Sequence, residues 1–315
     1  MNAVYIALAI AAGILLLFFV FTLACFLLVF YSPKRRVLAP DEYELPKGEI
    51  YKEFHESIIN WTKEMRALPH EELSIKSHDG LTLRGKFYEY EKGAPIEILF
   101  HGYRGSGERD LCGGLHRCRH LGRSALIVDQ RAAGTSDGHI ISFGINERRD
   151  CKRWIEYAVE RFGEDAEILI TGISMGAATV MMTLDEELPP QVKSALADCG
   201  YTSPKEIIKK VLCDMHLPAS VFYPVIRLGA RIFGGFDLEE ASARSSIKKC
   251  KIPVIFIHGE DDNFVPCDMS RALYDACTSE KKMLYTVPNA GHGLSFPRDE
   301  DGYYAAIKKF EIIKL

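Results

Sequence analysis

The sequence predicts an α/β fold with a largely parallel central sheet, preceded by one membrane-spanning helix. Short apolar runs typical of buried strands alternate with helix-compatible stretches from residue 96 onward, which indicates parallel strands with helices on both faces. The chain has 315 residues, 47% of them apolar, which is enough to fill one sizeable domain. Its first 33 residues carry no charged side chain.

Residues 1–33 are interpreted as a single-pass transmembrane anchor. The apolar run over residues 4–30 is longer, at ~1.5 Å per helical residue, than the ~30 Å hydrocarbon core of a bilayer. A cleaved signal peptide is the competing interpretation. Its apolar region is typically only ~7–15 residues and follows a basic start, which this chain lacks.

Basic residues indicate the orientation of this anchor. Lys34, Arg35 and Arg36 follow the apolar run directly, and no basic side chain precedes it. The positive-inside tendency therefore predicts a domain on the cytoplasmic side of the cell membrane. Eight of the nine cysteines lie outside the run without paired or metal-ligand spacing, which also suits a reducing compartment.

Residues 34–70 predict a juxtamembrane linker, and residues 71–315 predict the folded domain. A helix is expected over residues 51–65, with apolar positions that pack on the domain or lie near the membrane. We interpret this segment as a tether. The domain then opens with two alternating runs, at residues 72–76 and 81–87, around a turn-like His78-Asp79-Gly80, which predicts an antiparallel start to the sheet.

Six further strands are predicted from apolar runs along the rest of the domain. They cover residues 96–100, 124–129, 167–171, 192–198, 252–258 and 282–287. The carboxyl ends of parallel strands meet at one edge of the sheet, where ligands bind in such folds. The loops that carry the chemical motifs below all follow these runs.

Gly172-Ile173-Ser174-Met175-Gly176 stands between an apolar run and a helix-compatible segment. A serine hydroxyl needs a base on one side and a substrate carbonyl on the other, and a strained turn between strand and helix presents it that way. Glycines at both ends relieve the crowding that this conformation causes. The motif predicts a nucleophilic serine.

An acid and a base follow downstream of this serine. Glu260, Asp261 and Asp262 come just after the run at residues 252–258, and His292 lies in a glycine-flanked loop after the last run. A histidine in such a loop can approach the serine closely, while a carboxylate fixes its tautomer. The chain order serine, acid, histidine therefore predicts a triad.

These residues resemble the α/β-hydrolases, and more narrowly the serine esterase, lipase and prolyl-oligopeptidase-like branch, from about residue 73 to the C-terminus. The resemblance selects Asp262 as the acid, through the pattern His-Gly-x-x-Asp-x-x-Val-Pro. It also implies that His-Gly-Tyr103 follows the third strand as an oxyanion loop, so the backbone N–H groups of Tyr103 and Met175 would hold the oxyanion.

The resemblance extends to the D-x-R-x-x-G-x-S loop at residues 129–136, where Ala133 replaces a histidine common in relatives. We expect Asp129 and Arg131 to hold this loop by ion pairing, and His101 and His258 to be loop-structuring residues. Asp198, at the end of the run at 192–198, is the alternative triad acid.

Residues 201–249 predict a helical cap over the active site. The segment is too long for a tight connection and too apolar for a linker. Its apolar side chains either hold an acyl chain or bury the cap against the core, since both roles need the same residue types.

The predicted function is a membrane-anchored serine hydrolase with Ser174, His292 and Asp262 as its triad, acting on carboxylic esters with an apolar or acyl part. The alternatives are a peptidase acting on short peptides and a catalytically idle binding module. No cofactor or metal site is implied, and the net charge of −4 gives no reason to expect nucleic-acid binding. The oligomeric state and the natural substrate do not follow from the sequence.

Overall fold

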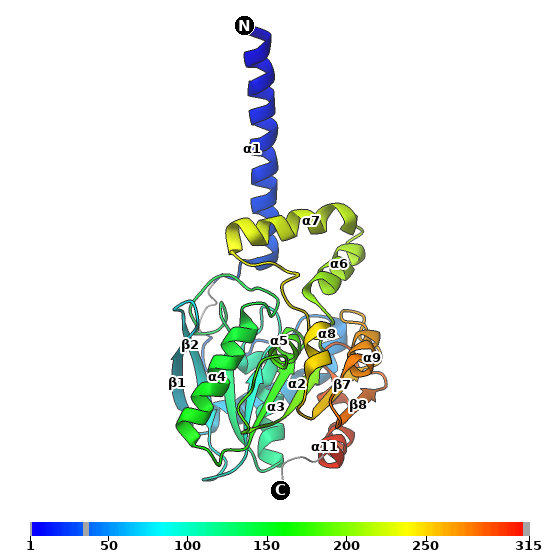
Figure 1. The fold of residues 1–315 in the computed structure, drawn as a ribbon. Helices are drawn as coiled ribbons and strands as arrows, with labels where there is room; N and C mark the ends of the chain where they lie inside the picture. The colour runs from blue at the N-terminus through cyan, green and yellow to red at the C-terminus, as the bar shows by residue number, and fades with distance from the viewer. Residues whose placement is uncertain (1, 34–37, 311–315) are drawn as a thin grey trace.

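The computed structural model describes residues 2–33 and 38–310 and contains one eight-stranded sheet with helices on both faces (Figure 1). The strand order is β1-β2-β4-β3-β5-β6-β7-β8. β2 is antiparallel to both of its neighbours, and all the other pairs are parallel. The strands are β1 (Glu71–Lys76), β2 (Thr82–Tyr88), β3 (Ile96–Phe100), β4 (Ser124–Asp129), β5 (Ile168–Ile173), β6 (Val192–Asp198), β7 (Val254–Gly259) and β8 (Lys282–Val287).

These strands confirm the predicted α/β class and the antiparallel start. Every predicted run became a strand within about two residues of its predicted ends. The central strands were recognisable because they are buried on both faces and appear as continuous apolar runs. β3 shows this most clearly, since all five of its residues are buried.

The helices divide between the two faces of the sheet. Two buried apolar clusters form the core, one containing residues of α4, α5 and α9 and the other residues of α2, α3 and α11. The helices are α1 (Asn2–Phe30), α2 (His55–Ala67), α3 (Gly107–His120), α4 (Glu147–Phe162), α5 (Met175–Thr183), α6 (Pro204–Asp214), α7 (Ala219–Gly229), α8 (Ala243–Ser246), α9 (Cys267–Ala276), α10 (Ser295–Arg298) and α11 (Glu300–Phe310), with short helices η1 (Glu49–Phe54), η2 (Ala230–Gly234) and η3 (Ile247–Lys249).

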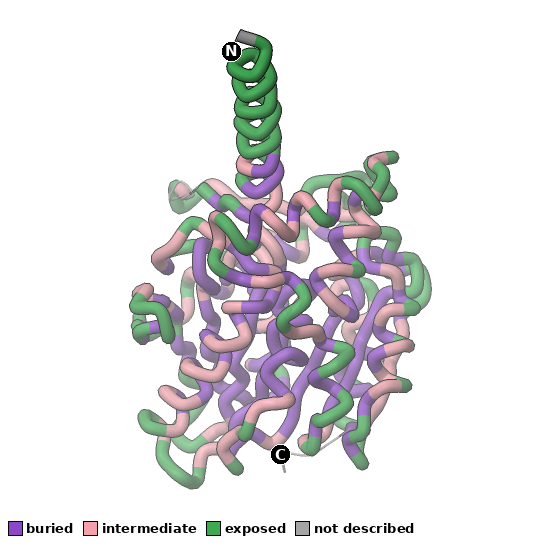
Figure 2. Tube along the Cα trace, turned by 45° about the horizontal axis from the view of Figure 1, so that its top comes forward, coloured by how far each residue is buried: buried purple, intermediate pink, exposed green. Residues whose placement is uncertain are grey.

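Helix α1 has an exposed part and a buried part. Residues 3–21 are all exposed, whereas Thr22, Cys25, Phe26 and Phe30 are buried at its base (Figure 2). Of the described residues, only this helix is long and apolar enough to cross a membrane. Lys34, Arg35 and Arg36, on which the predicted orientation rests, lie outside the described residues.

In the described part of the segment interpreted as a tether, residues 38–70, the apolar positions pack on the domain, which was one of the two placements expected for them. η1 and α2 pack on the domain, and Ile58, Trp61 and Met65 of α2 belong to the same buried cluster as α3 and α11. An amphipathic helix shows one apolar face in its sequence, but the partner of that face is set by tertiary packing.

The segment 201–249 is helical, as expected, but it packs toward α1. α7 crosses the base of α1 (Figure 1) and contacts it directly. Gly229 of α7 lies close against α1, since a Cβ there would lie 3.0 Å from the Cβ of Phe26. The buried apolar side chains of this segment, such as Leu212 and Ile226, therefore serve packing, which was one of its two expected roles.

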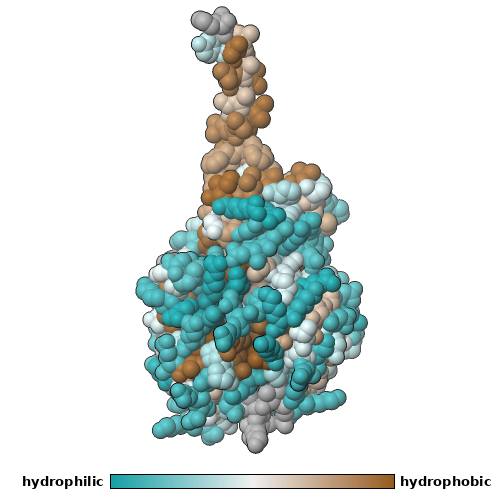
Figure 3. Space-filling model, viewed as in Figure 1, coloured by the Kyte–Doolittle hydropathy of each residue, from teal (hydrophilic) through white to brown (hydrophobic). Residues whose placement is uncertain are grey.

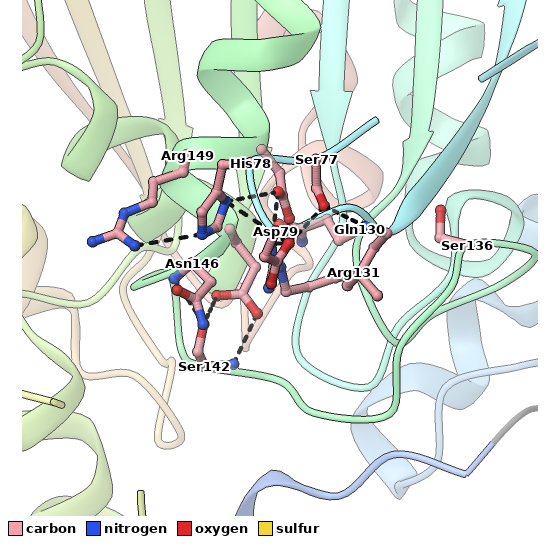
Figure 4. A network of polar contacts seen from close by, with 12 residues as sticks. Ser77, His78, Asp79, Gln130, Arg131, Ser136, Ser142, Asn146 and Arg149 are labelled. Atoms are coloured by element: carbon pink, nitrogen blue, oxygen red, sulfur yellow. Dashed lines mark hydrogen bonds and ion pairs between the residues drawn. The ribbon is translucent and has the colours of Figure 1, made fainter. Parts of the chain in front are cut away.

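The loop after β4 is held by a polar network (Figure 4). The guanidinium of the buried Arg131 donates to Asp150 at 2.6 Å and to Asp79 at 2.9 Å, so its predicted ion-pairing role is confirmed. Asp129 acts differently: its carboxylate accepts from the backbone N–H groups of Gly107 and Thr135. The loop is thus fixed by both charge pairing and backbone hydrogen bonds.

Candidate active site

The turn between β5 and α5 holds Ser174 in an unusual backbone conformation. Ser174 has φ 55° and ψ −115°, a region that non-glycine residues adopt only when the surrounding structure imposes it. A Cβ at Gly172 would lie 2.1 Å from the backbone of Gly176, and one at Gly176 would lie 2.0 Å from the carbonyl oxygen of Phe100. Only glycine fits at either position.

The structure brings Ser174, His292 and Asp262 together from three separate loops. Nε2 of His292 lies 2.9 Å from Oγ of Ser174, and Nδ1 of His292 lies 2.6 Å from Oδ2 of Asp262. A carboxylate on Nδ1 favours the tautomer with its proton on that nitrogen, which leaves Nε2 free to accept the serine proton.

Asp262 is buried and fully hydrogen-bonded. Its Oδ1 accepts from the backbone N–H groups of Phe264 at 2.9 Å and Val265 at 2.8 Å, while Nε2 of His258 lies 3.2 Å from Oδ2. Burial acts to raise the pKa of Asp262, but the hydrogen bonds from His258 and His292 outweigh it and hold this pKa well below its usual range. The carboxyl is therefore ionised at neutral pH.

His258 has the loop-structuring position that the sequence suggested. Its Nδ1 lies 2.6 Å from Oγ of Ser270, and its Nε2 also lies 2.8 Å from the carbonyl oxygen of Val265. With these contacts it ties the end of β7 to the loop that carries Asp262, so it positions the carboxylate.

Asp198 faces different partners. Tyr303 donates to its Oδ2 at 3.0 Å and Ser295 to its Oδ1 at 3.3 Å, while its backbone carbonyl accepts from the N–H of Ser174 at 2.8 Å. Burial raises the pKa of Asp198. A buried carboxyl in contact with two hydroxyls, rather than with His292, is poorly placed to orient the base.

The loop after β3 is braced on the domain and on α1. Nε2 of His101 accepts from the backbone N–H of Gln130 at 3.1 Å, and Asp110 accepts from the N–H of Gly102 at 3.0 Å. The hydroxyl of Tyr103 donates to the carbonyl oxygen of Val29 at 2.5 Å. Arg104 donates to Leu28 at 2.8 Å and Tyr31 at 2.9 Å, so two side chains of this loop satisfy carbonyls at the end of α1.

A pocket of about 330 Å³ opens beside Ser174. Its apolar wall comes from α2, α3 and α10, through Ile58, Trp61, Leu111 and Phe296. Tyr103, Phe264 and His292 also line it, whereas none of its lining residues comes from 201–249. The segment predicted as a cap therefore does not line this pocket. Part of the pocket wall comes instead from α2, which lies in the segment interpreted as a tether.

Sequence reasoning missed Tyr51 and Asp110. The hydroxyl of Tyr51, in η1, donates to the backbone carbonyl of His292 at 2.9 Å, and so connects the region before the domain to the loop of the histidine. Asp110 supports the loop of Tyr103 from α3. Neither stands in a recognisable motif, because each acts across a long sequence separation.

Two groups of potential metal ligands occur in the described part of the chain. Cys199 joins Asp262 and His292, which already bond to each other, and the second group is His78, Asp79 and Asp150. In the second group the guanidinium of Arg131 supplies the positive charge to both carboxylates. Neither arrangement calls for a metal ion.

Comparison with solved structures shows the fold. The Pyrococcus furiosus esterase Pf2001 superposes with a TM-score of 0.67 over 89% of this chain and 97% of its own, at 19% identity. A family model described as serine hydrolase (FSH1) matches residues 168–298. This range includes Ser174, Asp262 and His292.

The chain has the α/β-hydrolase fold. Among curated relatives of this chain, the Bacillus subtilis protein YqkD is 26% identical over 197 residues, covering 62% of this chain and 64% of its own. The match therefore spans less than two thirds of that relative.

One further relative and one further solved structure are also similar to this chain. The Saccharomyces cerevisiae protein YNL320W, described as a membrane protein, is 23% identical over 80% of this chain and 83% of its own length. Pyrococcus horikoshii acylaminoacyl peptidase superposes with a TM-score of 0.56 at 19% identity, over 78% of this chain and 42% of its own. Both esterases and a peptidase thus share the fold.

Proposed function

We propose that this protein is a serine hydrolase, and more narrowly a carboxylic ester hydrolase that works through a covalent acyl-enzyme. The observation that carries the proposal is the unbroken chain of contacts from Ser174 to His292 at 2.9 Å and from His292 to Asp262 at 2.6 Å. Such a chain is what a serine needs to become a nucleophile.

The reaction follows from these contacts. Ser174 Oγ attacks the ester carbonyl carbon as its proton passes to Nε2 of His292, and Asp262 stabilises the imidazolium that forms. The C–O bond to the alcohol then breaks, and the alcohol leaves with the proton from His292. A water repeats the sequence on the acyl-enzyme, releasing the carboxylic acid and restoring the serine.

The oxyanion of each tetrahedral intermediate needs preorganised donors. We assign these to the backbone N–H groups of Tyr103 and Met175. Met175 is the first residue of α5, and Tyr103 lines the pocket. The N–H groups at a helix start lack intrahelical acceptors, which supports this role for Met175.

The walls of the pocket favour an apolar acyl group. Ile58, Trp61, Leu111 and Phe296 offer an apolar surface close to Ser174, and each buried methylene of a ligand contributes about 0.8 kcal/mol. Peptide hydrolysis is the second candidate, because an acylaminoacyl peptidase shares the fold. The apolar wall favours the ester. A catalytically idle binding module does not need the three connected side chains.

The location follows from α1. We propose that this helix spans a membrane as a single pass and that the domain lies on the cytoplasmic side, as the basic residues after it in the sequence indicate. Protease added to intact cells is then expected to spare the domain.

The test uses the full-length protein and its Ser174→Ala variant. We expect a fluorophosphonate to label the first and not the second, and turnover of p-nitrophenyl esters to fall by ~10⁴-fold or more. Both proteins should melt at similar temperatures. Labelling that is unchanged in Ser174→Ala would remove the assignment, and faster turnover of short peptide amides than of esters would favour the peptidase.

A further inference from the structure

The first observation is the length of the exposed part of α1. Residues 3–21 are exposed along their whole length, about 28 Å at ~1.5 Å per residue, which matches a hydrocarbon core of ~30 Å. Burial begins at Thr22, where the helix enters the domain. If α1 spans a membrane, the surface of the domain around Thr22 lies at the membrane interface.

The elements at that level are α7 and η2. Phe222 of α7 packs on Phe21 with ring centroids 6.0 Å apart, and Phe233 of η2 packs on Phe19 at 5.2 Å. Both partners on α1 belong to its exposed part. Side chains of α7 and η2 therefore reach beyond the level at which α1 becomes buried.

The outer face of this segment is apolar. Met215, Val221 and Ile232 are 62%, 58% and 54% exposed, and they are three of the seven exposed large hydrophobic residues described outside α1. We call these three residues the apolar rim. The opposite face of α7 buries Tyr223 and Ile226. Figure 3 shows the hydrophobic surface of α1 continuing onto the adjoining top of the domain, above a largely hydrophilic body.

The charged side chains beside the rim are paired. Arg227 donates to Asp237 at 2.6 Å, Arg231 bonds to the same carboxylate, and Lys210 of α6 pairs with Asp214 at 2.5 Å. Immersing this face in an interface therefore leaves few unpaired charges to desolvate. A helix with one apolar face that lies across a membrane-spanning helix is the arrangement of an interfacial helix.

We propose that the segment from Met215 to Ile232 is a second membrane contact, with the apolar rim inserted into the interface of the bilayer that α1 spans. The occupant of this surface is lipid. The carboxyl edge of the sheet then faces the membrane, because Tyr103, which follows β3, bonds to Val29 at the base of α1.

The test measures the depth of the rim in a bilayer. Cys213 is the one exposed cysteine among the nine, all of which are described, and it adjoins the rim. Full-length protein is labelled with the environment-sensitive dye NBD and then reconstituted into phosphatidylcholine vesicles. The dye is attached either to native Cys213 or, in a Cys213→Ser background, to the new cysteine of Val221→Cys or Ile232→Cys. Lipids with a nitroxide near the headgroup act as the quencher.

A matched control is Lys92→Cys in the same background. Lys92 is exposed in the turn between β2 and β3, at the edge of the sheet opposite Tyr103. We expect nitroxide lipids to reduce the emission at positions 221 and 232 by about twofold or more and that at 92 hardly at all. Native Cys213 provides a labelled site without substitution in case a variant unfolds.

Two results would overturn the proposal. One is quenching at positions 213, 221 and 232 no greater than at 92, which would place the rim in water. The other is a blue-shifted but unquenched emission, which would indicate that protein, such as a second copy of the chain, covers the rim instead of lipid.

Discussion

The backbone conformation of Ser174 depends on the close packing of the residues around it. Its positive φ is held by the close packing of α5 on β3, where the carbonyl of Phe100 leaves room only for glycine at position 176. Backbone strain of this kind costs of order 1–3 kcal/mol and persists only where surrounding contacts compensate for it. The buried contacts of α5, the helix that follows Ser174, compensate for this strain.

Asp262 and Asp198 can be told apart by one pair of substitutions. Asp262→Asn is expected to lower kcat of ester hydrolysis by ~10⁴-fold, because the amide no longer fixes the tautomer of His292. Asp198→Asn, which keeps acceptors and donors near Tyr303 and Ser295, is expected to cost far less. Steady-state kinetics on both variants checks this, and a larger loss in Asp198→Asn would make Asp198 the acid.

Glu97 is a buried charge that the sequence did not single out. It lies in β3 and is paired with Arg117 and with Arg123, the latter at 2.9 Å, while Thr171 donates to it at 2.7 Å. Burial alone would raise the pKa of Glu97, but the two arginines outweigh burial and lower it to about 2. The folded state therefore binds this proton more weakly than the unfolded state does.

Because the folded pKa is depressed, Glu97 contributes stability that is fully present above its unfolded pKa of ~4.3 and is lost as the pH falls toward 2. Glu97→Gln is expected to destabilise the protein by about 3–5 kcal/mol at pH 7, since it leaves two buried arginines without their carboxylate. The loss should shrink on acidification. Urea unfolding between pH 7 and pH 3 measures it, with the exposed Glu91→Gln as control.

At the scale of elements, α2 takes one of the two placements expected from its sequence, since it packs on the domain. Its apolar face packs against α3, where a Cβ on Gly113 would lie 3.1 Å from the ring of Trp61. This close packing places Trp61 and Ile58 in the wall of the pocket. The helix before the domain therefore helps to set the shape of this pocket.

Trp61→Leu tests this role. The smaller side chain is expected to deepen the pocket, so the optimum among p-nitrophenyl esters should move to longer acyl chains, at a cost in stability of about 2–3 kcal/mol. Phe222→Leu is the matched control, because Phe222 lies on α7 outside the pocket. An optimum that moves with Phe222→Leu and stays fixed with Trp61→Leu would assign the acyl site to the cap.

At the scale of the whole molecule, α1 and the domain share one core. Phe26 and Phe30 are 3% and 0% exposed and belong to the main buried cluster, and the rings of Phe30 and Phe236 lie 5.3 Å apart. A backbone hydrogen bond also connects α1 to the domain, since the N–H of Ile141 donates to the carbonyl oxygen of Phe30 at 2.9 Å. α1 and the domain are thus continuous in structure, although the sequence predicts them as separate units.

Protein from which all of α1 has been removed is therefore expected to be unstable. Protein starting at Ser32 loses Phe26 and Phe30, and Phe30→Ala alone should cost about 3–5 kcal/mol. Protein starting at Phe21 keeps both side chains and should melt at a higher temperature. Thermal unfolding compares the two, with Leu16→Ala in the full chain as an exposed control. Equal melting temperatures would show that the base of α1 contributes nothing.

The sequence by itself determined the class of fold, the strands, the apolar span and the order of Ser174, Asp262 and His292. These features are local: periodicity, glycine placement and apolar length act within a few residues of the chain. Only the tertiary structure decided that α2 lines the pocket, that α7 crosses α1, and that His292 meets Asp262 while Asp198 meets Tyr303. The local sequence around an apolar face or a carboxylate does not identify its partner, because the packing contacts and hydrogen bonds form between segments that lie far apart in the chain.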